Sequence, residues 1–329
     1  MAITGSGQVS LNDIQTEYGG SNPIGLSEYY SKGNAPGSGE IQLATDFYGT
    51  SNIGTAWTTT TAISSSRDRR GTRGSGSNSD FLLMGGYDTA YRNYTDEWNG
   101  SSWAAQSGMP GSYLTGWYDG CAFGRSSNDA GSGAGYRYNY SAQSKEYNGS
   151  SWSMAGTMNT GRQSACGAGE STNAAFIGGG YNGSLITSTE EYNGSSWATA
   201  NNMIYTTYVS NAMGSLNDGM QVGGQTAGSD SQSCSEYNGT NWSAGGNLTM
   251  TAGYLCVSFG ETVATAHAVG SSGNDDAHDA YNGSSWSTAT GMSVGHHAGG
   301  GGGGDASGFV ASGLTGGAAT LTNTCEEWT

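Results

Sequence analysis

Aromatic and polar residues alternate in a short phrase that recurs along the chain. The phrase runs from Glu or Ala through an aromatic residue and Asn-Gly to Trp, as in EWNGSSW at 97–103. The other copies are EYNGSSW at 146–152 and 191–197, EYNGTNW at 236–242 and AYNGSSW at 280–286. Asn-Gly between two strand-favouring aromatic segments is the strongest short signal for a tight hairpin whose two central residues have φ > 0. Each copy therefore predicts a hairpin tip.

The tryptophans that close these phrases, together with an earlier one, set a regular period. They are Trp57, Trp103, Trp152, Trp197, Trp242 and Trp286, spaced 46, 49, 45, 45 and 44 residues apart. This is the period of a four-stranded propeller blade. An apolar residue follows each of them six positions later: Ile63, Met109, Met158, Met203, Leu248 and Met292. We expect this position to be buried in every unit.

Glycines mark the ends of two further strands in each unit. A strand of small residues ends at Gly, a polar turn follows, and an apolar strand then ends in a Gly pair, as in FLLMGG at 81–86 and GMQVGG at 219–224. This order of a Gly pair, an aromatic residue, a Trp and an apolar residue resembles the kelch repeat over about residues 55–329. The resemblance implies a kelch-like β-propeller and no particular function, since such propellers serve many.

The two ends of the repeat region complete each other. Trp57 has no Asn-Gly before it, and the chain finishes at Cys325-Glu326-Glu327-Trp328-Thr329, which is the first half of the phrase without its turn. Joining these halves produces a sixth unit whose outermost strand, 56–61, comes from the N-terminal side. The sequence therefore predicts an all-β, six-bladed propeller over residues 51–329, closed by the strand around Trp57.

Residues 1–50 do not follow the repeat. GSGQVSLNDI at 5–14 and GSGEIQLATDFYG at 37–49 echo each other, and each predicts a short strand running into a helical turn, as in a small α+β module. This segment resembles a module of virion structural proteins of tailed phages, particularly marine and cyanobacterial ones. The resemblance implies attachment to other virion proteins through residues 1–50. From the residues alone, a subdomain that caps the propeller is the alternative.

Charge and cysteine content exclude several classes of function. The chain has 10 basic and 26 acidic residues, a net charge of −16, which disfavours nucleic acid as a partner. It lacks an apolar run of 18 residues and a conventional secretion signal, so we expect no membrane insertion. Five cysteines recur at related repeat positions and are expected to be buried free thiols: Cys121, Cys166, Cys234, Cys256 and Cys325.

Candidate catalytic and metal sites are weak. The four histidines lie in the last two predicted blades, and His278 shares the repeat position of Cys234 and Cys325, which predicts a packing residue. Asp275, Asp276 and Asp279 lack EF-hand spacing and predict a solvated acidic loop, although calcium binding stays open. The Glu of the phrase recurs once per blade, too far apart for paired-carboxylate hydrolysis. We therefore predict no enzyme activity, no cofactor and no metal.

Two groups of residues are candidates for binding. Arg67, Arg69 and Arg73 share strand parity and predict a site for an anion or a particle contact, the alternative being pairing with acids of neighbouring blades. Aromatic residues outside the phrase are candidates for contact with sugars or proteins, the alternative being packing between blades. They are Trp117, Tyr118, Tyr136, Tyr138, Tyr140 and Tyr181.

These inferences combine into a non-enzymatic virion structural protein of decoration, fibre or knob type. Residues 1–50 would attach it to the particle in multiple copies, and the propeller would contact a protein or a host-surface glycan. The alternative is a carbohydrate-active propeller enzyme or a secreted glycan-binding lectin.

Overall fold

The computed structural model describes residues 56–68, 73–110, 120–135, 139–250, 255–271, 273–316 and 320–329. The chain divides into two units, Met1–Gly54 and Thr55–Thr329, and all described residues belong to the second. The attachment module predicted for residues 1–50 lies outside the described residues and stays a prediction.

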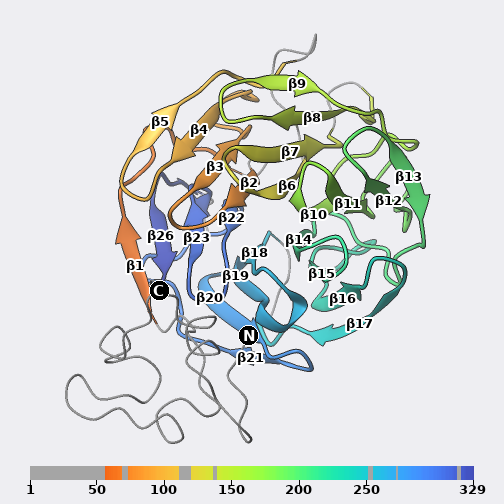
Figure 1. The fold of residues 1–329 in the computed structure, drawn as a ribbon. Helices are drawn as coiled ribbons and strands as arrows, with labels where there is room; N and C mark the ends of the chain where they lie inside the picture. Colours follow the sequence, from red (N-terminus) through yellow and green to blue (C-terminus); the bar gives the residue numbers. More distant parts are fainter. Residues whose placement is uncertain are drawn as a thin grey trace, which may run out of the picture. The chain divides into compact units, whose positions relative to one another are not determined.

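The second unit is a six-bladed β-propeller (Figure 1), as the repeat predicted. Each blade is a four-stranded antiparallel sheet, and the innermost strands of successive blades are neighbours around the central axis. From the innermost strand outward, blade 1 contains β2 (Arg73–Gly76), β3 (Phe81–Met84), β4 (Thr95–Trp98) and β5 (Trp103–Ala105). Blade 2 contains β6 (Cys121–Ser126), β7 (Asp129–Gly133), β8 (Ser144–Tyr147) and β9 (Trp152–Met154). Blade 3 contains β10 (Cys166–Ser171), β11 (Ala174–Gly178), β12 (Thr189–Tyr192) and β13 (Trp197–Ala200).

The second half of the ring follows the same order. Blade 4 contains β14 (Asn211–Gly214), β15 (Gly219–Val222), β16 (Ser233–Tyr237) and β17 (Trp242–Asn247). Blade 5 contains β18 (Val257–Phe259), β19 (His267–Ser271), β20 (Asn274–Tyr281) and β21 (Trp286–Thr288), with the short 3₁₀ turn η2 (Val263–Thr265) between its first two strands. Blade 6 contains β22 (Gly300–Gly302), β23 (Gly308–Ala311), β26 (Cys325–Trp328) and β1 (Trp57–Thr60). A small hairpin, β24 (Leu314–Thr315) and β25 (Thr320–Leu321), extends the loop between β23 and β26.

Blade 6 is assembled from the two ends of the repeat region. The N-terminal strand β1 pairs antiparallel with the C-terminal strand β26, and Trp57 stands opposite Trp328. The ring therefore closes as the divided phrase predicted, with three strands from the C-terminal side and one from the N-terminal side.

The core lies at the seams between blades. Apolar side chains from the facing sheets of each adjacent pair form one buried cluster per seam. The residue six positions after each repeat tryptophan is buried in every case, with at most 5 % of its surface exposed. The five cysteines are buried and free, as expected.

The Asn-Gly loops differ from the predicted two-residue turn. Trp98 and Trp103 oppose each other across β4 and β5, so the loop holds four residues. Asn99 Oδ1 accepts hydrogen bonds from the backbone N–H groups of Ser101 (3.0 Å) and Ser102 (2.9 Å). Gly100 has a φ of +86°, whereas Asn99 is not in the positive-φ region. The prediction of two positive φ angles was wrong because the Asn side chain, rather than a left-handed Asn backbone, closes the turn.

The glycine that ends the innermost strand is required by close backbone approach. Gly76 has a φ of +117°, and a Cβ added to it would lie 1.9 Å from the Asp80 carbonyl oxygen. The equivalent Gly124 and Gly303 meet a backbone oxygen at 2.2 and 2.1 Å in the same way. In the described ranges, no helix has the length and apolar character that a bilayer span requires.

Replacing Gly76 by Ala is expected to destabilise the propeller more than replacing Gly228, which has the same φ of +117° but no atom within 4 Å of its added Cβ. Gly228→Ala should cost the backbone strain alone, about 1–3 kcal/mol. Gly76→Ala should cost about 2 kcal/mol more, because a carbonyl in a sheet cannot move aside. Thermal and urea unfolding of both variants measure the difference, and equal losses would contradict the steric explanation.

Candidate functional site

The recurring glutamates are hydrogen-bonded to the tyrosine of the next blade. The Tyr192 hydroxyl donates to Glu146 Oε1 at 2.6 Å, and this pattern repeats around the ring. The other pairs are Tyr147–Glu97, Tyr237–Glu191 and Tyr281–Glu236. Burial of the phenol, together with its bond to the carboxylate, raises the pKa of Tyr192 to about 12. These glutamates join blades, as the once-per-blade spacing indicated.

This series of Glu–Tyr bonds stops on both sides of blade 6. In blade 5, Ala280 occupies the glutamate position, and in blades 6 and 1 the tyrosine position holds Trp328 and Trp98. Each of these indoles donates instead to a backbone oxygen, of Asp305 (2.8 Å) and Asn78 (2.7 Å) respectively. Both of these bonds lie within one blade, blade 6 or blade 1, so they do not replace the Glu–Tyr contact between blades.

Three repeat tryptophans, Trp152, Trp197 and Trp242, bind the first residue of the preceding blade's third strand, whereas Trp103 and Trp286 donate to the backbone oxygens of Thr61 and Gly245. The indole N–H groups of the first three donate to the hydroxyl oxygens of Thr95, Ser144 and Thr189 in three successive blades. His278 holds the same position in blade 5, is 1 % exposed, and receives the indole N–H of Trp57 at 3.2 Å. Its prediction as a packing residue is thus supported by its burial and contacts.

Arg67 is sealed inside the propeller and is not available to a ligand. It has no exposed surface, and its guanidinium lies 2.6 Å from Asp96 Oδ2. It also donates to Ser65 Oγ (2.8 Å) and lies 5.7 Å from the centre of the Tyr94 ring. For this residue the anion-site hypothesis is corrected, because pairing with an acid on β4 consumes its charge. Arg162 forms the same kind of buried pair with Glu190, at 2.7 Å.

The remaining members of the two predicted groups are placed only in part. Arg73 begins β2, the innermost strand of blade 1, and Arg69 lies outside the described residues. Trp117 and Tyr118 also lie outside them. Tyr181 is half-buried in the loop after β11, where its ring meets Tyr140 edge-on at 5.7 Å.

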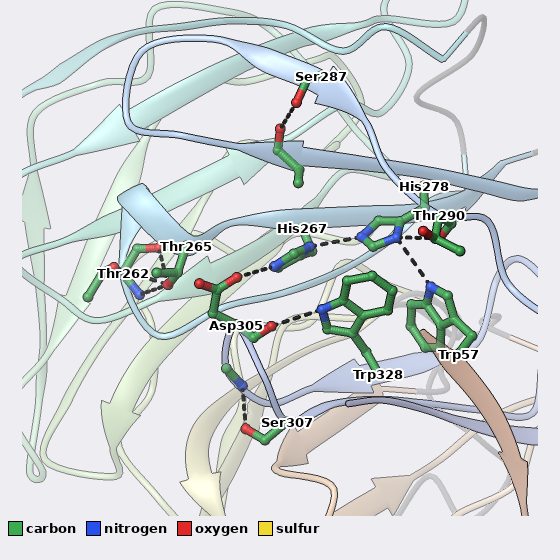
Figure 2. A network of polar contacts seen from close by, with 12 residues as sticks. Trp57, Thr262, Thr265, His267, His278, Ser287, Thr290, Asp305, Ser307 and Trp328 are labelled. Atoms are coloured by element: carbon green, nitrogen blue, oxygen red, sulfur yellow. Dashed lines mark hydrogen bonds and ion pairs between the residues drawn. The ribbon is translucent and has the colours of Figure 1, made fainter. Parts of the chain in front are cut away.

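A chain of polar contacts fills the seam between blades 5 and 6 (Figure 2). Asp305 Oδ1 lies 2.9 Å from His267 Nε2, and His267 Nδ1 lies 2.8 Å from His278 Nε2. His278 Nδ1 contacts both the Thr290 carbonyl oxygen (2.8 Å) and the indole of Trp57. Burial and the neighbouring His267 lower the pKa of His278 to about 4. Both histidines are almost completely buried, so the chain is structural rather than open to a substrate.

Two buried residues had no signal strong enough to single them out from the sequence. His296 lies 3.4 Å from Glu326, at the positions that Arg162 and Glu190 occupy in blade 3. Burial acts to raise the pKa of Glu326, but bonds from His296 and from two backbone N–H groups hold it below its usual range. Lys145 occupies the acid position in blade 2, and burial lowers its pKa to about 7. An acid recurs as the second residue of the third strand, as at Asp96, Glu190 and Glu326. If the register of that strand had been known, this recurrence would have pointed to Lys145 and to the partner of Glu326.

The predicted acidic loop is a strand. Asp276 and Asp279 lie in β20, and Asp279 is 1 % exposed. Its carboxylate accepts hydrogen bonds from the backbone N–H groups of Thr249 (2.6 Å) and Met250 (3.0 Å). Asp279 therefore links two segments of blade 5 instead of facing solvent. Among the described residues, no three metal-ligating side chains converge.

Tyrosines gather at one end of the ring. Antiparallel strands alternate in direction, so the loops between second and third strands share an end with the connections between blades. The described tyrosines on these segments form what we call the tyrosine face: Tyr87, Tyr91, Tyr94, Tyr140, Tyr181, Tyr205 and Tyr208. All seven keep part of their surface exposed.

Short backbone bridges fix the tyrosine face in place. Tyr87 pairs with both Asp68 and Tyr91, and its ring lies 5.0 Å from that of Tyr91. Tyr181 pairs with Gln163 and Leu185 in the corresponding loop of blade 3. Because the backbone on both sides is bonded, the rings are held in position rather than carried on free loops. This face is the candidate binding site.

A charged pair lies beside the tyrosines of blade 1. Arg92 Nε donates to both carboxylate oxygens of Asp88, at 2.8 and 2.9 Å, and its guanidinium lies 5.5 Å from the centre of the Tyr94 ring. Burial opposes ionisation of Asp88, but Arg92 and the backbone N–H groups of Thr89 and Ala90 lower its pKa to about 2. The face thus combines aromatic surface with a fixed polar group.

The opposite end of the ring has a pocket at the mouth of the central channel. Its volume is about 520 Å³, including open solvent, and the ends of all six innermost strands line it. Arg125 and Glu261 lie on this rim, and the Arg125 guanidinium donates to the Glu261 carbonyl oxygen. Glycines dominate the lining, so the pocket offers mainly backbone groups.

Comparison with known proteins supports the fold alone. No protein-family model matches the chain, and no curated protein matches its sequence. A solved structure described as "Structure of YjhT" is similar, with a TM-score of 0.62 and 13% sequence identity, over 80% of this chain and 95% of that one.

Removing the positive charge of Arg67 is expected to be far more damaging than removing that of Arg92. Arg67→Met leaves the buried Asp96 carboxylate without its partner, which should cost about 3–5 kcal/mol of unfolding free energy. Arg92→Met breaks an exposed pair and should cost less than about 1 kcal/mol. Both guanidinium groups lie near the Tyr94 ring, so the pair is matched for that contact. Similar losses in urea unfolding would show that burial of the pair is not decisive.

Proposed function

We propose that this protein is a non-enzymatic binding and display protein whose propeller presents the tyrosine face to a glycan. The observation that carries the proposal is the set of partly exposed tyrosine rings held on bonded backbone at one end of the ring. Aromatic faces pack well against the C–H face of a sugar, while the phenol hydroxyl offers a polar contact at the edge. A preformed surface also loses little conformational entropy on binding.

The state of the repeat carboxylates favours binding over hydrolysis. Each repeat glutamate accepts a hydrogen bond from a tyrosine hydroxyl of the next blade, so its carboxylate is used in the contact between blades. These residues are Glu97, Glu146, Glu191 and Glu236. A propeller glycosidase would instead need two carboxyl groups facing one sugar. A secreted glycan-binding lectin would use the same tyrosine face, and differs from our proposal only in where the protein is found.

The location that we propose is a phage virion, with residues 1–50 as the attachment module. This rests on the resemblance of SLNDIQTEYGG at 10–20 and the closing DFYG at 46–49 to modules of tailed-phage structural proteins. The propeller would then be a kelch-like decoration, fibre or knob domain, present in many copies and contacting other virion proteins through its N-terminal module. Rigid, sequence-tolerant propeller surfaces suit such display, since the loops vary while the seams hold the ring.

Removal of the aromatic rings in blades 2 and 3 should weaken glycan binding. We expect the Tyr140→Ala/Tyr181→Ala double variant to bind a glycan selected on an array about 10-fold more weakly, since a lost ring contact is worth about 1–1.5 kcal/mol. The control is Met154→Ala, which removes a non-aromatic apolar side chain that is 49% exposed on β9, the outermost strand of blade 2. Calorimetric titration gives the affinities. Unchanged affinity in a correctly folded double variant would exclude this face as the site.

Deletion of residues 1–50 should abolish incorporation into the particle and leave the propeller intact. We expect quantitative mass spectrometry of purified particles to find the full chain at a fixed stoichiometry and the truncated chain at background level. The melting temperature of the truncated propeller should equal that of the propeller in the full chain. Incorporation of the truncated chain at the full level would contradict the attachment role, whatever the result of the glycan assay.

A further inference from the structure

The seam between blades 5 and 6 contains a hydrogen-bonded series of side chains that can hold an additional proton. It runs from Asp305 through His267 and His278 to Trp57, with contacts of 2.9, 2.8 and 3.2 Å (Figure 2). Trp57 opens β1, the strand that closes the ring and that follows the first unit of the chain. The series therefore ends on the one strand whose pairing completes the propeller.

His278 stands where blades 1, 2 and 3 have a non-titrating hydroxyl residue and blades 4 and 6 have Cys234 and Cys325. Thr95, Ser144 and Thr189 each accept the indole N–H of the next blade through a hydroxyl oxygen, which accepts at every physiological pH. An imidazole nitrogen accepts only while it carries no proton. The acceptor for Trp57 is therefore conditional on pH, unlike those of the three blades above.

In the neutral state, every nitrogen of the series has one role. The Trp57 indole donates to His278 Nδ1, His278 Nε2–H donates to His267 Nδ1, and His267 Nε2–H donates to the Asp305 carboxylate. The Thr290 carbonyl oxygen lies 2.8 Å from His278 Nδ1 and can accept a hydrogen bond from it only when Nδ1 carries a proton, so the contacts of Nδ1 with Thr290 and with Trp57 exclude each other. This arrangement needs no charge other than that of Asp305.

An added proton changes the partner of His278 Nδ1. With one proton shared by the two imidazoles, His278 Nδ1–H donates to Thr290, and the positive charge of the pair faces the Asp305 carboxylate. Nδ1 can no longer accept from Trp57, whichever imidazole carries the charge. The bond to the closing strand is exchanged for a bond to the loop after β21.

We propose that His278 and His267 form a proton-operated latch, which holds β1 through Trp57 when neutral and releases that indole when protonated. The latch belongs to the ring and does not depend on what the tyrosine face binds. Phe259 stacks on His267 at 4.7 Å and Trp328 meets His278 edge-on at 4.7 Å, so the imidazoles cannot turn away to avoid the exchange.

The charged groups around the latch are few. Asp305 lies in the turn between β22 and β23 of blade 6 and contacts His267. Glu261 of blade 5 lies beside Gly304, the residue before Asp305. On β26, Glu326 is directed to Ser293 and Val294, and Glu327 stands opposite Thr58. Asp305 is therefore the counter-charge that the protonated pair meets directly.

The sign of the pH dependence follows from burial of His278. Its pKa is lowered from 6.5 to about 4, so between these values the unfolded chain binds more protons than the folded one. Stability due to the neutral imidazole is therefore complete above about pH 6.5 and is lost as pH falls toward 4. Stability should therefore fall within this window, and the Trp57 contact of the folded protein should be exchanged as the pH approaches 4, where His278 itself takes up the proton.

The test compares melting temperatures between pH 7.5 and 4.5 for the full chain and three variants. His278→Thr restores the hydroxyl acceptor found at Thr189, and its acid-induced fall should be about 5 °C smaller than that of the wild type. Asp305→Asn removes the counter-charge and should move the acid transition to lower pH. Cys325→Thr, a change at the same repeat position in blade 6, is the control and should behave as the wild type. An acid-induced fall as large in His278→Thr as in the wild type would overturn the latch.

A measurement on the unmodified chain keeps the proposal testable if His278→Thr does not fold. Indole N–H exchange, followed by NMR at pH 7 and at pH 4, where His278 of the folded protein takes up its proton, and corrected for intrinsic rates, should show loss of protection at Trp57. Trp197, whose acceptor is the Ser144 hydroxyl, serves as the internal control and should keep its protection. Parallel changes at both indoles would indicate general acid loosening and contradict the latch.

Discussion

The hydrogen bond from each blade's outer tryptophan to the preceding blade is the contact on which the ring depends. A buried indole is costly unless its N–H finds an acceptor. In this propeller the acceptor is supplied by another blade, as when Trp242 donates to Thr189 at 3.0 Å. The tyrosine on the third strand of a blade depends on the preceding blade in the same way, because its hydroxyl donates to a glutamate there. Trp98 and Trp328 find an acceptor within their own blades, whereas the outer tryptophans find theirs in the preceding blade and so join neighbouring blades.

Because of this constraint, most of the repeated polar side chains are used in buried contacts within the ring. The recurring glutamates accept tyrosine hydroxyls, and the buried arginines neutralise acids on the third strands of their own blades. Surface chemistry is left to the two ends of the ring, where loops are not bound by the repeat. Of these ends, one presents backbone groups around the channel and the other presents tyrosine rings on fixed backbone. The second end is the one that we propose binds a glycan.

The closing blade departs from the pattern because it is made from two distant segments. Neither of its seams has the Tyr–Glu bond, since Ala280, Trp328 and Trp98 occupy the positions that would form it. Histidines take the places that hydroxyl and arginine residues hold in other blades, at His278 and His296. The proton-operated latch that we propose would act at this closure, because His278 contacts the N-terminal strand through Trp57.

The sequence by itself determined the number of blades, the order of their strands and the closure by Trp57, because these follow from a period and from the two halves of one phrase. It also determined which positions are buried, since Ile63 and its equivalents keep one register relative to the tryptophans. It did not determine partners. Arg67 shares strand parity with Arg69 and Arg73, which suggested a common site. Its pairing with Asp96 depends instead on the path of the segment between β1 and β2, which places it against β4. His278 and Trp57 are 221 residues apart, and only the closed ring brings them into contact. Repeats encode local geometry, whereas contacts across a seam are set by the rotation of one blade against the next, and that rotation exists only in the tertiary structure.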